Sequence, residues 1–313
     1  PSCKGGSHVC GFSRHQHIMK SQLLKSDLLL LITGLIWGFA FVAQRIGMDH
    51  VGPFTFNGIR FALGSLSLIP LVMVTRRNHR SDKPDPKGLS LVMIILSGCL
   101  TGLVLFMGAS LQQVGLVYTT AGKAGFITGL YVVIVPVLWF FRGRQSGSGT
   151  WIGAAMAAAG LYLLSVTGGF TIQFGDLLEI VGAFFWALHI LLISHFSKRI
   201  DPIVLSLIQF AFCSFCSLVT ALVFETITLQ GILDAGFPIL YGGLGSVGIA
   251  YTLQVVAQRN AHPAHAAIIL SLESVFAAVG GWLLLNEILS TRSKIGCALM
   301  FSGMLFSQLR NRN

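Results

Sequence analysis

The sequence predicts an all-α integral membrane protein with ten transmembrane helices, arranged as two inverted five-helix repeats. Three observations predict this fold class: the composition, the length of the apolar segments and an internal duplication. Hydrophobic residues make up 54% of the chain and charged residues only 10%, whereas soluble globular proteins carry about 25% charged residues. A water-soluble domain and a disordered chain are therefore excluded, because too little polar surface is present to cover the apolar side chains.

Ten apolar segments are long enough to cross a bilayer, which requires about 20 residues of helix. In chain order they span residues 28–47, 54–74, 90–114, 119–141, 150–167, 176–197, 203–224, 237–258, 264–285 and 293–310. Charged, proline-rich or glycine-rich stretches separate them, such as residues 82–86 and 142–149. The segments lack the two-residue alternation of outer-membrane barrel strands, so each is expected to be a helix.

The distribution of lysine and arginine predicts that both termini face the cytoplasm. With the N-terminus inside, sixteen of the 21 basic residues flank the cytoplasmic ends of the segments. The opposite ends are flanked by only four, namely Arg45, Lys123, Arg292 and Lys294. This excess follows the positive-inside rule. It accounts for the net charge of +10 without a nucleic-acid partner.

Residues 1–26 are expected to form a cytoplasmic N-terminal segment. The chain begins with Pro1, and Met19 resembles a natural start just before the first apolar segment. Residues 1–18 are therefore interpreted as an upstream extension or a remnant of an expression vector.

An internal duplication divides the chain into two halves, residues 27–168 and 175–310. At an offset of 149 residues Trp37 aligns with Trp186, and at an offset of 143 residues Trp139 aligns with Trp282. Each half contains five segments, and because five is odd, the second half must enter the membrane upside down. Inverted repeats are typical of secondary transporters, whose substrate lies near the bilayer midplane between the repeats.

A membrane-embedded enzyme or a sensory module is the alternative class. The sequence contains no HExxH, GxSxG or phosphate-loop motif. Residues 243–248 match GxGxxG but lie inside an apolar helix, where glycines let helices pack closely, and Gly153 and Gly303 are interpreted in the same way. Cys213 and Cys216 have the CxxC spacing without a second cysteine or histidine pair nearby. We expect neither a metal nor a cofactor.

Several stretches are similar to one known family. Residues 35–41, Leu-Ile-Trp-Gly-Phe-Ala-Phe, look like its tryptophan-glycine opening, and Arg60-Phe61-Ala62 resembles its second helix. Residues 111–130 are similar to its third-to-fourth helix junction. Residues 267–287 look like its ninth helix, with Ser274 in place of the usual proline. Over residues 27–310 the chain thus resembles the drug/metabolite transporter superfamily, specifically EamA-type permeases. The resemblance implies inner-membrane permeases, often exporters, that use neither a cofactor nor ATP.

Polar side chains inside the apolar segments are the candidates for a substrate site, because each is costly without a partner or a cavity. Glu273 lies about 13 Å into its helix by the helical rise. It is the best candidate for binding an amine or coupling transport to protons, with a structural link as the alternative. His189 is a second candidate for coupling, although a lone buried histidine is more often a packing residue. The predicted cavity walls are Trp37, Asn57, Gln112, Tyr118, Lys123, Tyr131, Trp186 and Gln254.

Three further charged residues have other interpretations. Arg60 lies about 9 Å from the outer end of its segment by the helical rise. It is interpreted as a structural intramembrane charge whose long stem reaches outward to the interface. Glu179 is only three residues into its segment and is expected at the interface. Lys123 either faces an anionic substrate group or reaches the interface.

These patterns together predict a multi-pass inner-membrane permease, expected to be an exporter, for small polar or amphipathic metabolites such as amino acids. Such a protein works by alternating access around a midplane cavity. The expected partners are a small-molecule substrate and the lipid bilayer, without nucleic acid. The sequence is compatible with a homodimer but does not imply one.

Overall fold

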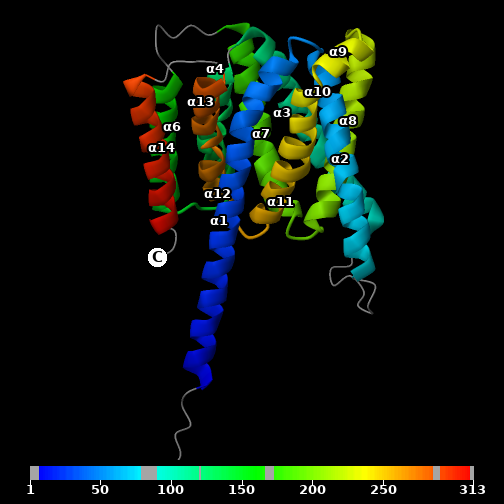
Figure 1. Ribbon diagram of the computed structural model, residues 1–313. Helices are drawn as coiled ribbons and strands as arrows, with labels where there is room; N and C mark the ends of the chain where they lie inside the picture. The colour runs from blue at the N-terminus through cyan, green and yellow to red at the C-terminus, as the bar shows by residue number, and fades with distance from the viewer. Residues whose placement is uncertain (1–6, 79–89, 120, 166–172, 285–289, 311–313) are drawn as a thin grey trace, which may run out of the picture.

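The structure is a computed structural model and describes residues 7–78, 90–119, 121–165, 173–284 and 290–310. Within these ranges all regular secondary structure is helical (Figure 1), which confirms the predicted all-α class. Eight helical stretches are long and apolar enough to cross a bilayer. They span Gln22–Gly47, Pro53–Val74, Leu91–Tyr118, Ala124–Phe141, Phe174–Phe196, Pro202–Phe224, Gly236–Gln258 and Pro263–Leu284.

Two further helices correspond to the fifth and tenth predicted segments but are not among these eight. They are α6 (Ser148–Ser165) and α14 (Thr291–Arg310), which lie side by side at one edge of the bundle (Figure 1). A Cβ atom added at Gly153 would come within 2.8 Å of the Gly303 carbonyl oxygen, and the reverse distance is the same. Both glycines therefore permit close backbone approach between helices, as predicted.

Five long helices form most of the bundle. They are α1 (Ser7–Gly47), α2 (Pro53–Asn78), α3 (Leu91–Tyr118), α7 (Phe174–Phe196) and α8 (Pro202–Phe224). Capping explains where α8 begins: Pro202 is its first residue, and the Asp201 carboxylate accepts hydrogen bonds from two amides of the first turn. Proline suits this position because the amide it lacks would have no partner within the helix. α1 begins well before the predicted residue 28 and projects beyond the other helices (Figure 1).

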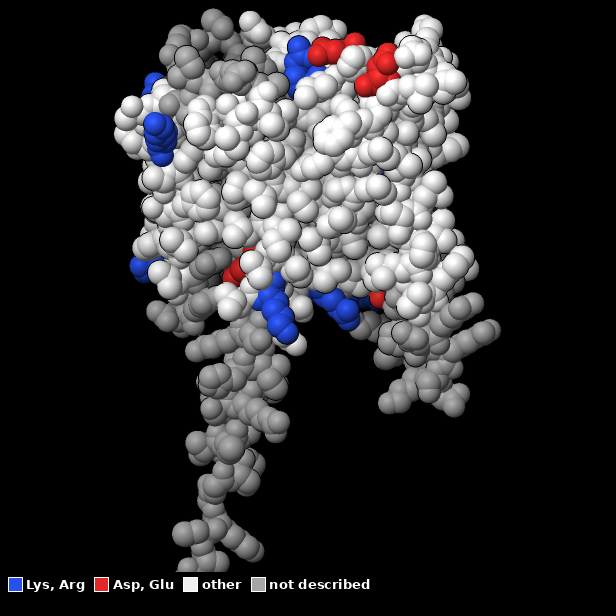
Figure 2. Space-filling view, viewed as in Figure 1, with Lys and Arg blue, Asp and Glu red and all other residues white. Residues whose placement is uncertain are grey.

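Apolar side chains cover the outside of the bundle. Phe141, Phe224 and Phe237 are each more than three-quarters exposed. Figure 2 shows charged side chains mostly near the two ends of the viewed face, with a broad uncharged band between them. A soluble monomer rarely exposes so large an apolar surface, whereas a bilayer supplies lipid tails to contact it.

Two of the predicted segments each consist of two helices separated by a short break. The fourth consists of α4 (Ala121–Thr128) and α5 (Tyr131–Phe141), and the ninth of α12 (Pro263–Leu270) and α13 (Glu273–Leu284). At each break several backbone bonds tighten to the i→i−3 pattern, including those from Leu130 to Ile127 and from Leu272 to Ile269. The breaks lie at corresponding places in the two halves, because the 143-residue offset carries residue 128 onto residue 271. The ninth segment breaks although Ser274 replaces the family's proline.

The eighth predicted segment is a composite helix. After the short α9 (Leu229–Asp234), the chain forms α10 (Gly236–Leu240), the π-helix η1 (Tyr241–Tyr251) and α11 (Thr252–Gln258). The GxGxxG motif lies within η1, where Gly243 and Gly248 each lack the Cβ that would collide with side chains of α2. These glycines therefore serve helix packing. π-Helices are rare and frequently occur at functional sites.

One carboxylate joins α8 to α2 at the end of the bundle that carries α9. Glu225, just after α8, accepts hydrogen bonds from the amides of Phe54 and Thr55, each at 2.8 Å. The Thr55 hydroxyl donates a third bond at 2.7 Å. The first amides of a helix have no partner within it, so the end of α8 supplies the cap for the start of α2.

Candidate functional site

A cavity lies in the interior of the bundle, where elements of both halves meet. The space between atoms is about 450 Å³, including the part that opens to solvent. Its lining comes from α1, α2, α3, α4, α5, α7, η1, α11 and α13. The lining residues are Trp37, Ala40, Phe41, Gln44, Arg60, Gln112, Thr128, Tyr131, Trp186, Ile190, Ser246, Tyr251, Gln254 and Glu273.

The helix breaks bring polar groups to this cavity. Thr128 is the last residue of α4, Tyr131 is the first residue of α5, and Glu273 is the first residue of α13. All three line the cavity. Interrupted helices are the usual way in which transporters present polar groups at the membrane midplane.

Glu273 and Tyr131 form a hydrogen bond between the two halves of the chain. The Tyr131 hydroxyl donates to a Glu273 carboxylate oxygen at 2.9 Å, and both side chains are buried. Among the described side chains, no lysine, arginine or histidine lies within ion-pairing distance of Glu273. An unpaired carboxylate is costly to bury, so a cationic group of a ligand would stabilise it.

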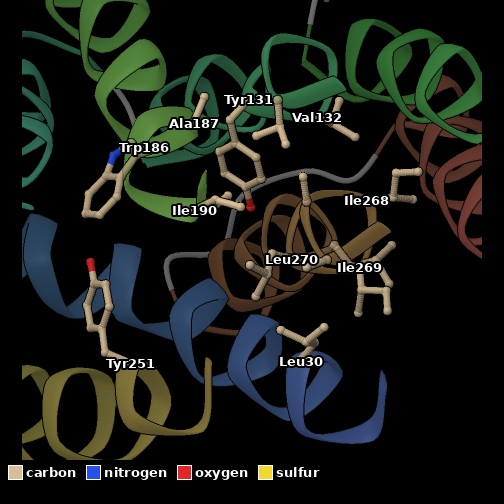
Figure 3. Packing of buried hydrophobic residues seen from close by; sticks show 14 of the residues in the cluster. Leu30, Tyr131, Val132, Trp186, Ala187, Ile190, Tyr251, Ile268, Ile269 and Leu270 are labelled. Carbon is tan, nitrogen blue, oxygen red and sulfur yellow. The ribbon is translucent and has the colours of Figure 1, made fainter. Parts of the chain in front are cut away.

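Tyr251 is the centre of an aromatic cluster on the cavity wall. Its ring centroid lies 4.5 Å from that of Trp37 and 6.1 Å from that of Trp186, with which it is stacked at 28°. Figure 3 shows Trp186 and Tyr251 facing each other, with the tyrosine hydroxyl directed toward the tryptophan. Trp37 is fixed by its indole N–H, which donates to the Ser246 carbonyl oxygen at 3.3 Å. These rings form an apolar wall with few polar atoms, which is typical of small-molecule sites.

Carboxamides form another part of the wall. The Gln112 amide donates to the Gln44 side-chain oxygen at 3.2 Å, and the Gln44 amide donates to the Ala40 carbonyl oxygen at 3.1 Å. The Gln254 side-chain oxygen is buried and has no hydrogen-bond partner among the described residues. A ligand donor in the cavity would satisfy this oxygen.

The structure contradicts the expected position of Arg60. Its side chain is 2% exposed and lines the cavity instead of reaching outward to the interface. The guanidinium carbon lies 5.5 Å from the Phe56 ring centroid and 5.1 Å from that of Phe61. Gly242 of η1 leaves room for the stem, since a Cβ there would lie 3.3 Å from Arg60 Cδ. Contacts with aromatic faces and this gap hold the arginine inside.

Two of the predicted wall residues are not among the described lining residues, and a third lies outside the described side chains. Asn57 is buried and donates to the Ala109 carbonyl oxygen at 3.0 Å, which links α2 to α3. Tyr118 is 55% exposed at the end of α3, where its ring meets Phe174 edge-on. Lys123 belongs to α4, but its side chain lies outside the described part of the structure.

Two further predicted residues lie behind the cavity wall. Glu179 is fully buried, because Gly115 of α3 leaves space for its carboxylate and Thr128 donates to it at 3.1 Å; its expected interfacial depth stays a prediction. His189 is buried, with Nε2 2.9 Å from the Gln209 side-chain oxygen, and its ring lies edge-on to Tyr251. Both residues touch a lining residue without lining the cavity themselves.

Sequence reasoning did not single out Gln44, Thr128, Ser246 or Tyr251. Gln44 lies next to Arg45 near a segment end and resembles an interfacial residue in the sequence. Tyr251 is one aromatic residue in a uniformly apolar stretch. The relevant signal is spatial, because the π-helix and the paired breaks determine which side chains surround the cavity.

A family model matches the chain twice, over residues 24–166 and 173–308, and it describes the EamA-like transporter family. The chain belongs to the EamA-like transporter family. An "uncharacterized transporter" of Archaeoglobus fulgidus is 32% identical over 288 residues, covering 92% of this chain and 87% of the relative. The "uncharacterized inner membrane transporter YedA" of Escherichia coli K12 is 24% identical, covering 82% of this chain and 81% of the relative.

A solved crystal structure shares the fold. It superposes with a TM-score of 0.74 at 18% sequence identity, and the match covers 91% of this chain and 98% of the other. At this identity the likeness concerns the fold alone. The chain is thus a member of a membrane transporter family with an all-helical fold.

Proposed function

We propose that this EamA-family protein is a multi-pass inner-membrane permease that exports small polar or amphipathic metabolites such as amino acids. The observation that carries the proposal is the cavity whose lining comes from both halves of the chain. Its aromatic wall suits an apolar substrate body, and Glu273 with Tyr131 suits an amine. The relative from Escherichia coli described as an inner membrane transporter supports the location.

The working cycle is alternating access around this cavity. In this proposal α6 and α14 complete ten transmembrane helices, the two halves have inverted topology, and both termini face the cytoplasm. The corresponding breaks between α4 and α5 and between α12 and α13 support the repeat. Helix breaks at corresponding positions beside a central site would allow each half of the bundle to bend, one after the other. Within the proposal, Glu273 couples transport to protons and no cofactor takes part.

Counterflow in proteoliposomes tests the proposal. The purified full chain is reconstituted, the vesicles are loaded with one unlabelled amino acid at a time, and uptake of its radiolabelled form is followed. Transient accumulation above equilibrium, with the substrate recovered chemically unchanged by mass spectrometry, is the expected result. Turnover of the substrate would favour an enzyme, and the absence of counterflow across amino acids and small amphipathic metabolites would contradict the permease.

A further inference from the structure

Arg60 is a buried cation without an anionic partner. Among the described residues it makes no hydrogen bond or ion pair, and its Nε is buried without a partner. Tyr251, which lines the same cavity, offers a hydroxyl and no carboxylate. Removing a guanidinium from water without an anion is costly. The Arg60 guanidinium is therefore a cation that an anionic group of a ligand could stabilise.

The surroundings of Arg60 favour a ligand over a structural function. The guanidinium borders the cavity and is held beside two aromatic faces, 5.5 Å from Phe56 and 5.1 Å from Phe61, so its stem is already ordered. A group ordered before binding loses little entropy when a ligand arrives. The planar fork of an arginine matches the two oxygens of a carboxylate or phosphate group.

Arg60 does not pair with Glu273, the one carboxylate among the described lining residues. Glu273 is bonded to Tyr131 and does not pair with Arg60, although both residues line the same cavity. Tyr251 lines the same cavity as both residues. The site thus presents a positive group and a carboxyl group that do not neutralise each other, with aromatic rings nearby.

We propose that Arg60 is the oxyanion-binding group of the cavity and that the transported molecule carries a carboxylate or phosphate group, which pairs with this guanidinium. This inference rests on the proposed function and adds a recognition element to it. Arg60 selects against neutral and purely cationic molecules, since binding them leaves the arginine unpaired.

Ligand binding to the purified full chain tests the assignment without transport. Trp37 and Trp186 line the cavity, so tryptophan fluorescence reports occupancy. The probes share one branched apolar body: leucine, 4-methylpentanoate, 3-methylbutyl phosphate and leucinamide. Leucine and at least one of the other two oxyanion probes should give saturable fluorescence changes, and leucinamide should bind roughly 10- to 100-fold more weakly. Tighter binding of 4-methylpentanoate would indicate carboxylate recognition, and tighter binding of 3-methylbutyl phosphate would indicate phosphate recognition.

Variants separate recognition from structure. Arg60→Gln should lose the preference for oxyanion probes, and Arg60→Lys should recover part of it. Arg45→Gln is the matched control, because Arg45 pairs with Asp49 on the exposed surface and should leave binding unchanged. Without ligand, Arg60→Met should melt at the same or a higher temperature than the wild type, since it removes an unpaired buried charge. A structural arginine would instead lower the melting temperature in Arg60→Met.

Three results would overturn the assignment: leucinamide binding as tightly as leucine, oxyanion probes binding equally well to Arg60→Gln, or no saturable binding by any oxyanion probe. Counterflow with the bound probe distinguishes this inference from the proposed function. Arginine-dependent binding without counterflow would refute transport alone. Counterflow of leucinamide that does not change in Arg60→Gln would refute the function of Arg60 alone.

Discussion

Glu273 and Glu179 are two buried carboxyl groups with similar partners and different surroundings. Each accepts a hydrogen bond from a hydroxyl beside the break between α4 and α5, Glu273 from Tyr131 and Glu179 from Thr128. Neither has a cationic partner within ion-pairing distance among the described side chains. Glu273 borders the cavity, whereas Glu179 packs against the backbone at Gly115.

The difference shows that burial and polarity do not identify a ligand site by themselves. A carboxyl group can exchange protons or meet a substrate only if a path of empty space or water reaches it. The cavity provides this space beside Glu273, whereas α3 fills the space beside the Glu179 carboxylate. We therefore expect Glu273 to be functional and Glu179 to be structural.

The largest effect is expected for Glu273→Gln. The amide cannot release a proton, so the pH dependence of counterflow should disappear, and flux should fall roughly 10- to 100-fold with the loss of a charge-assisted contact. Counterflow measured at several pH values between 5.5 and 8 checks this. Glu179→Gln is the matched control and should keep the wild-type pH profile. A changed pH profile in Glu179→Gln and an unchanged one in Glu273→Gln would show that Glu179, and not Glu273, is the functional carboxyl group.

Overpacking at Gly115 should affect stability more than transport. A Cβ there would lie 2.7 Å from a Glu179 carboxylate oxygen and 3.0 Å from its Cγ. Gly115→Val should therefore lower the free energy of unfolding by about 1–3 kcal/mol, measured by thermal unfolding in detergent. Gly125→Ala is the control, because its Cβ would meet its nearest neighbour at an ordinary 3.6 Å. Equal stability in the two variants would contradict tight packing around Glu179.

Removing the hydroxyl of Tyr131 should change the affinity of the cavity. Tyr131→Phe leaves Glu273 without its donor, which should alter amine binding by roughly tenfold. Titration of leucine by tryptophan fluorescence measures this change. Glu179→Gln alters the acceptor of the Thr128 hydroxyl without changing a lining residue and should leave leucine affinity within about threefold. A larger effect on affinity in Glu179→Gln would bring Glu179 into the binding site.

The smallest effect concerns His262, which lies just outside a membrane segment. Burial, together with His265 and Lys198, lowers the pKa of His262 to about 4. Because this pKa is below the unfolded value of about 6.5, the neutral ring contributes stability above pH 6.5. This contribution is lost as the pH falls toward 4. The melting temperature of His262→Gln should thus fall slightly less than that of wild type between pH 7 and 5, while the pH profile of counterflow stays unchanged.

The sequence predicts the helical class and most segment boundaries because hydrophobic length is a strong one-dimensional signal. Six of the residues that it predicts for a substrate cavity do line one cavity in the structure: Trp37, Gln112, Tyr131, Trp186, Gln254 and Glu273. Whether they bind substrate stays a prediction. The sequence separated Glu179 from Glu273 by their positions along their segments, but it could not show the space around each carboxylate, because that space depends on the neighbouring helix.

Other differences also have local physical causes. Arg60 was expected to extend outward because an isolated helix offers it no inner partner. In the bundle, the Phe56 and Phe61 rings and the gap at Gly242 accommodate it. The break before Glu273 has no proline or glycine to mark it, since Ser271 and Leu272 form the turn.

The cap that Glu225 provides for α2 has a mechanical consequence. Three hydrogen bonds converge on this carboxylate, and all three would break together if the start of α2 moved away from the end of α8. These bonds resist separation of the two helices at the end that carries α9. Widening the protein at that end between α2 and α8 would cost all three hydrogen bonds at once.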